Sequence, residues 1–230
     1  MIDFSPFEKN TDYFFKDKNL LTEAFTHRSY LNENPSWKGA HNERLEFLGD
    51  AVLELVVTEA LFARFPEKPE GELTSLRAAL VNANMLSGLA SDMNLNSFLL
   101  LSRGEAKDVG RARGYILANA FEALIGAIYL DGGYEETKKF IEKNLMPKID
   151  EVLEKKLFRD AKSLFQERAQ DIVGATPNYR VLEEWGPDHD KHFVIGVYLG
   201  EDLAASGEGP SKQAAEQNAA QDALAAKNWG

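Results

Sequence analysis

Apolar residues recur at helical spacing through the first two thirds of the chain. The pattern predicts helices at residues 18–26, 42–65, 72–94, 114–131 and 134–157. Residues that end helices separate them: Asn34-Pro35, Pro66 to Gly71, Arg103-Gly104 and Asp131-Gly132-Gly133. Residues 1–157 are therefore expected to form an all-α domain.

The remaining residues, 158–230, follow a different pattern. A helix is predicted at 162–173, and the runs YRVLEEW, HFVIGVYLG and LAASGEG alternate as strands do. An alanine-rich helix with Pro210 at its start closes the chain. The order α-β-β-β-α predicts a small α+β domain.

One predicted helix carries an unusual acidic stripe, in the stretch HNERLEFLGDAVLEL. Its apolar positions recur at helical spacing and are expected to face the core: Leu45, Leu48, Val52 and Leu55. Acidic residues at i, i+3 and i+7 share one narrow stripe: Glu43, Glu46 and Asp50. Like charges on adjacent turns repel by a few tenths of a kcal/mol. The stripe therefore either faces water or lies beneath something cationic, and Glu54, which extends it, is expected to be solvated.

Two further features suggest that this helix meets another. Gly49 in mid-helix costs about 1 kcal/mol relative to alanine, which favours close approach by a second backbone or a ligand. Asn119 and Glu122 stand at i, i+3 in an otherwise apolar helix, where a carboxylate is costly unless paired or metal-bound. Oxygen ligands from two helices suit Mg²⁺. The alternative is that Glu122 pairs with an arginine such as Arg44 or Arg77.

Composition and charge narrow the possibilities. The 230 residues, 44% hydrophobic and 27% charged, suit one large globular domain or two ordinary ones. The absence of cysteine fits a cytoplasmic protein, and the apolar runs are too short to predict a membrane span. The N-terminus lacks a basic segment followed by an apolar run, so no signal peptide is predicted. The net charge of −11 opposes nucleic-acid binding unless basic groups are sorted in space or divalent cations intervene.

The segment NERLEFLGDAVL resembles the signature of the bacterial ribonuclease III family, which are double-stranded-RNA endonucleases with a C-terminal double-stranded-RNA-binding domain. The resemblance also covers AFTHRSY (24–30), EGELTSLRAALV (70–81), SRGE (102–105) and LANAFEALIGAIYLDGG (117–133). It implies a homodimeric, Mg²⁺-dependent hydrolase that leaves 5′-phosphate and 3′-hydroxyl ends with short 3′ overhangs. It also implies a role in RNA processing, such as that of ribosomal RNA precursors.

The resemblance assigns a metal site. Glu46, Asp50 and Glu122 match the family's metal-binding carboxylates, with Asp50 and Glu122 as catalytic residues. Asn119 occupies a fourth position, where the family usually has Asp. The resemblance implies two Mg²⁺ ions, for which Mn²⁺ can substitute. These ions make a nucleophile from water and neutralise the leaving oxygen, so no side-chain nucleophile is needed.

The resemblance also assigns an RNA path and a dimer surface to the first domain. Glu43 and Glu70 match acidic positions close to the RNA, and the helix that carries Glu43, Phe47 and Leu48 belongs to the dimer surface. His27 is expected to order the core rather than to act as a general base.

The second domain resembles a double-stranded-RNA-binding domain. The positions expected to contact RNA lie on its first helix, in one loop and at the start of its last helix: Ser163, Gln166, Glu167, Gln170, His189, Lys212 and Gln213. The family usually has paired lysines where this chain has Lys212-Gln213, and Asp188 and Asp190 flank His189. Fewer cations predict weaker, less salt-sensitive binding.

Two other functions stay open. Asn119 removes a charge from the predicted metal site, so the alternative is a double-stranded-RNA-binding dimer with weak or lost cleavage. A structural or ribosome-assembly role without RNA cleavage is the third hypothesis. A further alternative concerns the second domain, which could be an α/β domain with an alanine-rich helix and no RNA role.

Overall fold

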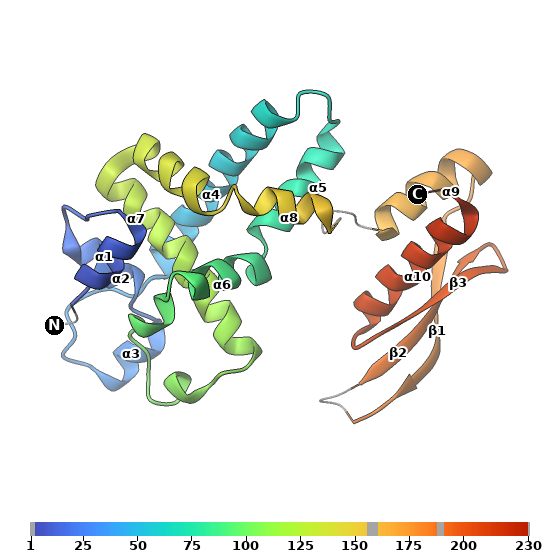
Figure 1. The fold of residues 1–230 in the computed structure, drawn as a ribbon. Coiled ribbons are helices and arrows are strands. Elements are labelled where there is room, and N and C mark those ends of the chain that lie inside the picture. Colours follow the sequence, from blue (N-terminus) through green and yellow to red (C-terminus); the bar gives the residue numbers. More distant parts are fainter. Residues whose placement is uncertain (1–2, 156–160, 188–190, 230) are drawn as a thin grey trace. The chain divides into compact units, whose positions relative to one another are not determined.

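The computed structural model describes residues 3–155, 161–187 and 191–229. The chain divides into two compact units, Met1–Phe158 and Arg159–Gly230, each with its own hydrophobic core (Figure 1). The domain boundary expected at 157/158 lies outside the described residues and stays a prediction.

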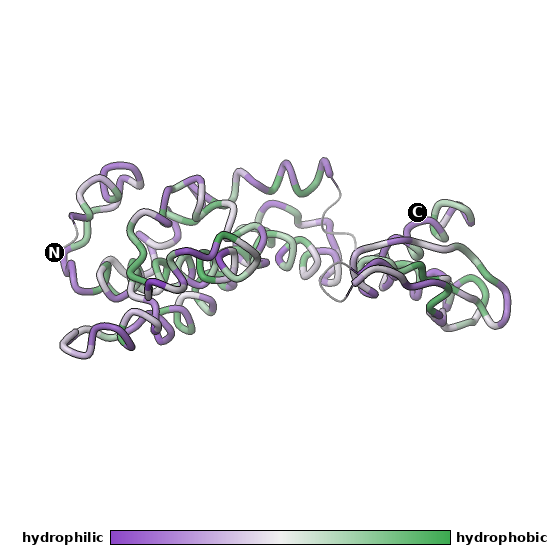
Figure 2. Tube along the Cα trace, turned by 90° about the horizontal axis from the view of Figure 1, so that it is seen from below, coloured by the Kyte–Doolittle hydropathy of each residue, from purple (hydrophilic) through white to green (hydrophobic). Residues whose placement is uncertain are grey.

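The described part of the first unit is helical, as predicted. Its elements, in chain order, are α1 (Ser5–Thr11), α2 (Lys18–Ala24), α3 (Arg28–Glu33), α4 (Glu43–Arg64), α5 (Glu70–Val81), α6 (Ala83–Asp92), the 3-10 turns η1 (Leu95–Ser97) and η2 (Glu105–Lys107), α7 (Arg111–Asn144) and α8 (Lys148–Glu154). The helices alternate apolar and polar stretches along their length (Figure 2), which lets each bury one side and hydrate the other.

The two long helices α4 and α7 form the centre of this unit. They pack against each other, and α6 and α2 pack on α7 (Figure 1). Within α7, the segment Ala112–Asn144 is long and apolar enough by composition to cross a membrane, which the sequence pattern did not predict. More than half of its most apolar window is buried inside the unit, as in the core helix of a globular domain.

Two glycines let the backbones of α4 and α7 touch. A Cβ built on Gly49 would lie 1.7 Å from the carbonyl oxygen of Glu122, and one on Gly126 would lie 2.2 Å from that of Leu45. No side chain larger than hydrogen fits at such distances. The predicted close approach at Gly49 is confirmed, and it brings the acidic stripe of α4 next to α7.

The predicted helix at 72–94 is two helices. Asn82 is extended (φ −73°, ψ 158°), and its side-chain oxygen accepts a hydrogen bond at 3.0 Å from the Met85 amide, so it caps α6. An Asn inside an amphipathic run can bond to the backbone and so start a new helix. The helix expected at 134–157 is also broken, because α7 ends at Asn144 and α8 begins after Pro147.

Other details differ from the pattern. The short helices α1 and α3 were not predicted, and Leu55, which was expected to face the core, is 56% exposed. Its neighbours Leu53 and Val56 are buried instead. The break expected at Asp131-Gly132-Gly133 appears as a kink at Gly133 (φ 79°).

The second unit has the predicted α-β-β-β-α order. Its elements are α9 (Ala161–Val173), β1 (Pro177–Trp185), β2 (His192–Leu199), β3 (Asp202–Gly209) and α10 (Lys212–Lys227). The sheet is antiparallel in the order β1-β2-β3, and both helices pack on it. Alanines allow α10 to lie close to the sheet: a Cβ on Gly207 would be 2.1 Å from the Ala219 nitrogen.

Candidate active site and RNA-binding surface

Four oxygen-bearing side chains gather where α4 crosses α7. Glu46 and Asp50 come from consecutive turns of α4, and Asn119 and Glu122 come from consecutive turns of α7. The Asn119 side chain hydrogen-bonds to Glu46, and the charges of Glu46 and Asp50 both act on Glu122. The structure therefore places these four residues at the α4–α7 crossing, near enough for their charges to act on one another, but it does not show them assembled around a metal ion.

The surroundings of this cluster disfavour the ionised forms of the Glu46 and Glu122 carboxyl groups. Burial, then the charges of Asp50 and Glu46, raise the pKa of the Glu122 carboxyl to about 7. Burial, followed by the charges of Glu43 and Asp50, raises the pKa of Glu46, while the hydrogen bond from Asn119 opposes the rise. The carboxylates thus repel one another, with Glu46 and Glu122 half-buried and Asp50 exposed.

Among the described residues, no cationic side chain forms an ion pair with Glu122. The alternative that Glu122 pairs with Arg44 or Arg77 is wrong, because Arg77 donates a hydrogen bond to the Thr58 hydroxyl at 2.9 Å and Arg44 is exposed without a bond to Glu122. An uncompensated carboxylate in this setting is costly. A bound cation would remove the cost.

The donor set fits a hard cation in chemistry but is not preassembled. Among the described residues, no three His, Cys, Asp or Glu side chains already stand close enough together to hold a metal ion. Carboxylate and amide oxygens are nevertheless the ligands that Mg²⁺ takes, and Mg²⁺ keeps several waters of its own. The charges of the three carboxylates act on one another. To bind one cation, the side chains of Glu46, Asp50 and Glu122 would have to move closer together.

The two further acidic positions lie in different places. Glu43 begins α4, one turn before Glu46, and forms an ion pair of 3.0 Å with Arg28; His41 Nδ1 lies 3.8 Å from its other oxygen. Glu70 begins α5 and lines a groove of about 400 Å³ together with Leu61. Along α4, the residues that line this groove lie roughly 12–18 Å beyond Asp50, the nearest member of the carboxylate cluster. A single chain therefore does not bring Glu70 to the carboxylate cluster.

The histidine of AFTHRSY orders the start of a helix rather than the core. His27 caps α3: its Nδ1 accepts a bond from the Ser29 amide and lies 2.8 Å from the Ser29 hydroxyl. Burial lowers its pKa. The sequence analysis missed its neighbour Arg28, the cation that covers the first member of the acidic stripe. The position of Arg28 inside the AFTHRSY motif was the feature of the sequence that could have pointed to it.

Several large apolar side chains of α4 are exposed. Phe47 is 82% exposed, and Leu55 and Phe62 follow it at helical spacing along the same helix, both exposed. Leu48, which was expected at the dimer surface with Phe47, is half-buried and packs against the core.

In the second unit, four of the expected RNA-contacting residues share one exposed face of α9. They line a hollow of about 370 Å³ together with Asp171: Ser163, Gln166, Glu167 and Gln170. His189 lies outside the described residues. Lys212 and Gln213 are exposed in the first turn of α10, which the Ser211 side chain caps by accepting a hydrogen bond from Ala214 at 3.2 Å.

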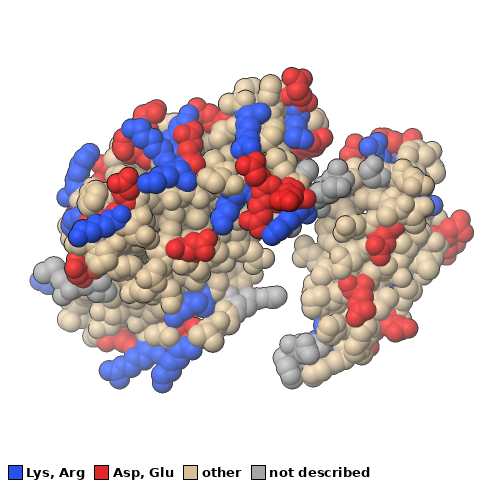
Figure 3. Space-filling view, viewed as in Figure 1, with Lys and Arg blue, Asp and Glu red and all other residues tan. Residues whose placement is uncertain are grey.

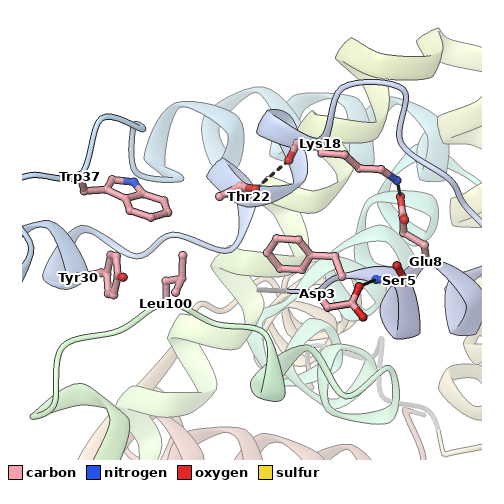
Figure 4. A pocket seen from close by; sticks show the side chains of 9 residues that line it. Asp3, Ser5, Glu8, Lys18, Thr22, Tyr30, Trp37 and Leu100 are labelled. Carbon is pink, nitrogen blue, oxygen red and sulfur yellow. Dashed lines mark hydrogen bonds and ion pairs between the residues drawn. The ribbon is translucent and has the colours of Figure 1, made fainter. Parts of the chain in front are cut away.

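A cavity of about 580 Å³ lies away from these sites, between the N-terminal segment and α2 (Figure 4). Phe4, Tyr30, Trp37 and Leu100 supply its apolar lining, and Lys18 lies at its edge in an ion pair with Glu8. None of the clustered carboxylates lines it, so this cavity is not the candidate active site.

Comparisons with known proteins agree with the resemblance. A family model described as Ribonuclease-III-like matches residues 17–149, and one described as Double-stranded RNA binding motif matches residues 161–227. Ribonuclease 3 of Desulfotalea psychrophila is 48% identical over 96% of this chain and 90% of its own length. Ribonuclease 3 of Nitratiruptor sp. is 46% identical over 95% of this chain and 94% of its own length.

A solved structure supports the same assignment for the first unit. The nuclease domain of ribonuclease III from Campylobacter jejuni, described for flexibility in its region involved in dimer formation, is 46% identical. It covers 63% of this chain and 99% of its own, with a TM-score of 0.56. Together with the helical nuclease unit and the α-β-β-β-α unit, these matches show that the chain belongs to the ribonuclease III family of endonucleases that act on double-stranded RNA.

Proposed function

We propose that the chain is a Mg²⁺-dependent endonuclease whose active site is the carboxylate cluster at the α4–α7 crossing. The observation that carries the proposal is the half-buried Glu122, which repels Glu46 and Asp50 and has no cationic partner among the described residues. Clusters of this kind are typical of cation-binding sites, because without a cation the repulsion between the carboxylates destabilises the fold.

Each residue of the cluster has a proposed role. Glu46, Asp50 and Glu122 hold metal through carboxylate oxygens, Asp50 and Glu122 closest to the reacting phosphate, and Asn119 contributes its amide oxygen. Magnesium ions held there, with Mn²⁺ as a possible substitute, lower the pKa of water and neutralise the leaving oxygen in phosphodiester hydrolysis. The rigid crossing at Gly49 and Gly126 keeps the ligands of the two helices in register. Glu43 lies one turn away, beside the RNA path.

We further propose that the active form is a homodimer formed through α4. The exposed Phe47 and its apolar neighbours along that helix support this, as does the distance of Glu70 from the carboxylate cluster. A second copy could bring Glu70 to the RNA held at the first copy's cluster. The Campylobacter jejuni relative has a region involved in dimer formation in the same domain.

In this proposal, the second unit binds the double-stranded RNA that the first unit cuts. The polar face of α9 suits a minor groove with its 2′-hydroxyls, and the capped N-terminus of α10 suits phosphates. Cutting of each strand by one subunit would leave 5′-phosphate and 3′-hydroxyl ends with short 3′ overhangs. Processing of ribosomal RNA precursors and a cytoplasmic location complete the proposal; both stay predictions.

The test compares cleavage with binding. Glu122→Gln and Asp50→Asn should abolish cleavage of duplex RNA in Mg²⁺, because each removes a metal-holding charge. Gel-shift affinity in Ca²⁺ should stay within about twofold of the parent, because binding is spread over both units. Cleavage near the parental rate in either variant would contradict the site.

Asn119 favours a second candidate function, a duplex-binding dimer with weak or lost cleavage. It hydrogen-bonds Glu46 and carries no charge, so the cluster has three carboxylates rather than four. A cleavage assay of the unaltered protein, with and without Mg²⁺, separates this candidate from the nuclease.

A further inference from the structure

An arginine stands beside the proposed active site without a role in it. Arg28 is the first residue of α3, and its guanidinium lies 3.0 Å from the Glu43 carboxylate. Glu43 precedes Glu46 by one helical turn, and its charge acts on Glu46. Arg28 is therefore the cation that covers the end of the acidic stripe nearest the proposed metal site.

The position of Arg28 is fixed by a backbone framework rather than by its own side chain. The Asn42 amide donates to the Thr26 carbonyl at 2.9 Å, which joins the start of α4 to the segment before α3. His27 N–H donates to the Leu100 carbonyl at 3.0 Å, and Ser102 N–H donates to the Ser29 hydroxyl at 3.1 Å. The segments AFTHRSY and SRGE thus clasp each other and hold Arg28 over Glu43.

Arg28 keeps most of its hydrogen-bonding capacity. The guanidinium has five N–H donors, and the ion pair with Glu43 engages Nη1. Its side chain is 67% exposed, against 46% for Glu43. Among the described residues Glu43 is its one ionic partner, so the remaining donors face solvent. A planar, weakly hydrated guanidinium with open donors suits a phosphate.

The acidic side chains around the proposed active site would repel RNA, and a nearby cation would reduce that repulsion. An RNA strand that enters the acidic cluster meets repulsion from Glu43, Glu46 and Asp50 in a chain of net charge −11. On the face drawn in Figure 3, basic and acidic side chains alternate over the nuclease unit rather than forming one basic patch. His27 cannot share the task, because burial lowers its pKa and favours the neutral ring.

We propose that Arg28 binds a backbone phosphate of the RNA strand next to the one that is cut, with Glu43 holding the guanidinium in place. The inference rests on the proposed active site at the α4–α7 crossing. The ion pair orders the side chain before RNA arrives, which reduces the entropy lost on binding. AFTHRSY then serves to set a phosphate-binding cation at a fixed place beside the carboxylates.

The test measures duplex affinity of the full-length protein in Ca²⁺ across a salt series. Arg28→Gln should weaken binding about three- to tenfold and lower the slope of log Kd against log salt by about one, because one phosphate contact is lost. Arg28→Lys should keep the slope and part of the affinity. Glu43→Gln should keep the slope and weaken binding less than Arg28→Gln does, because it removes the ion pair that orders the guanidinium but leaves the phosphate-binding group itself.

Arg64→Gln is the matched control. Arg64 lies at the other end of α4 in an ion pair of 2.6 Å with Asp150, and its removal should change neither affinity nor slope. Thermal unfolding should show both arginine variants folded, since exposed ion pairs contribute about 0–1 kcal/mol. Equal Kd and slope for Arg28→Gln and Arg64→Gln would overturn the proposal, as would an equal loss in Arg28→Gln and Glu43→Gln.

Glu122→Gln in the same series separates this failure from that of the active site. If Glu122→Gln abolishes cleavage while Arg28→Gln binds as the parent does, Arg28 alone is excluded. If Glu122→Gln still cleaves, the site itself is misplaced.

Discussion

At the scale of single residues, Glu122 makes the stability of the metal-free protein depend on pH. Its pKa is about 7 in the folded chain against an ordinary value of 4.5. Between these values the folded state holds a proton that the unfolded state has lost, so the contribution of Glu122 to stability is full below pH 4.5 and is lost as pH rises through 7. The Glu122→Gln variant has no such proton to lose.

We therefore expect Glu122→Gln to stabilise the metal-free protein at pH 8 and to leave it nearly unchanged at pH 5. The gain should be about 1–2 kcal/mol, below the full linkage value because the side chain is only half-buried. Urea unfolding of both proteins at the two pH values, with chelator present, measures it. An equal difference at both pH values would show that Glu122 is not protonated in the folded state.

A separate prediction concerns the effect of Asn119 on metal affinity. One charge gained beside a divalent ion is worth on the order of 1 kcal/mol once water screens it, or about five- to tenfold in affinity. Asn119→Asp should shift the Mg²⁺ requirement for cleavage to lower concentration by that factor, while Asn119→Ala should shift it upward or abolish activity. A Mg²⁺ titration of cleavage compares the three proteins. If Asn119→Ala follows the parent throughout, the amide is not a ligand.

At the scale of elements, the crossing of α4 and α7 places the site. A methyl group at Gly49 would sit 1.7 Å from a carbonyl oxygen of α7, so Gly49→Ala must push the helices apart. We expect a loss of at least about 3 kcal/mol in unfolding free energy, at the upper end of overpacking effects. Cleavage should fall as well, because the ligands of the two helices separate.

Gly88→Ala is the control for helix propensity. Gly88 is exposed in α6, and a Cβ there meets nothing within 4 Å. That substitution should stabilise the protein by about 0.5–1 kcal/mol. Chemical unfolding of both variants checks the pair, and similar effects at the two glycines would contradict the close crossing.

At the scale of the whole molecule, the proposed active site lies entirely within the first unit. Residues 1–157 alone should fold, sediment as a dimer and cleave duplex RNA at low salt, with lower affinity than the full chain. Analytical ultracentrifugation and a cleavage assay test this. A monomer would refute the dimer proposal, and inactivity at low salt and high enzyme concentration would show that the second unit completes the site.

Several elements could be predicted from pattern alone, and others could not. The apolar periodicity of α4 and α7 and the alternation of the three strands are local signals, and they were interpreted correctly. The split at Asn82 and the exposure of Leu55 depend on how α4, α5 and α6 pack, which no local pattern contains. The same reason hid Arg28, whose partner Glu43 lies in another helix.

The sequence by itself determined the family, the order of elements and the residue types of the site, because these depend on local spacing and on motifs such as NERLEFLGDAVL. The tertiary structure decided which of these residues meet. Backbone contact at Gly49 and Gly126 brings Glu122 to Glu46 and Asp50, whereas the length of α4 keeps Glu70 away. Pair distances and burial set the charges of such groups, and both arise only when the helices pack.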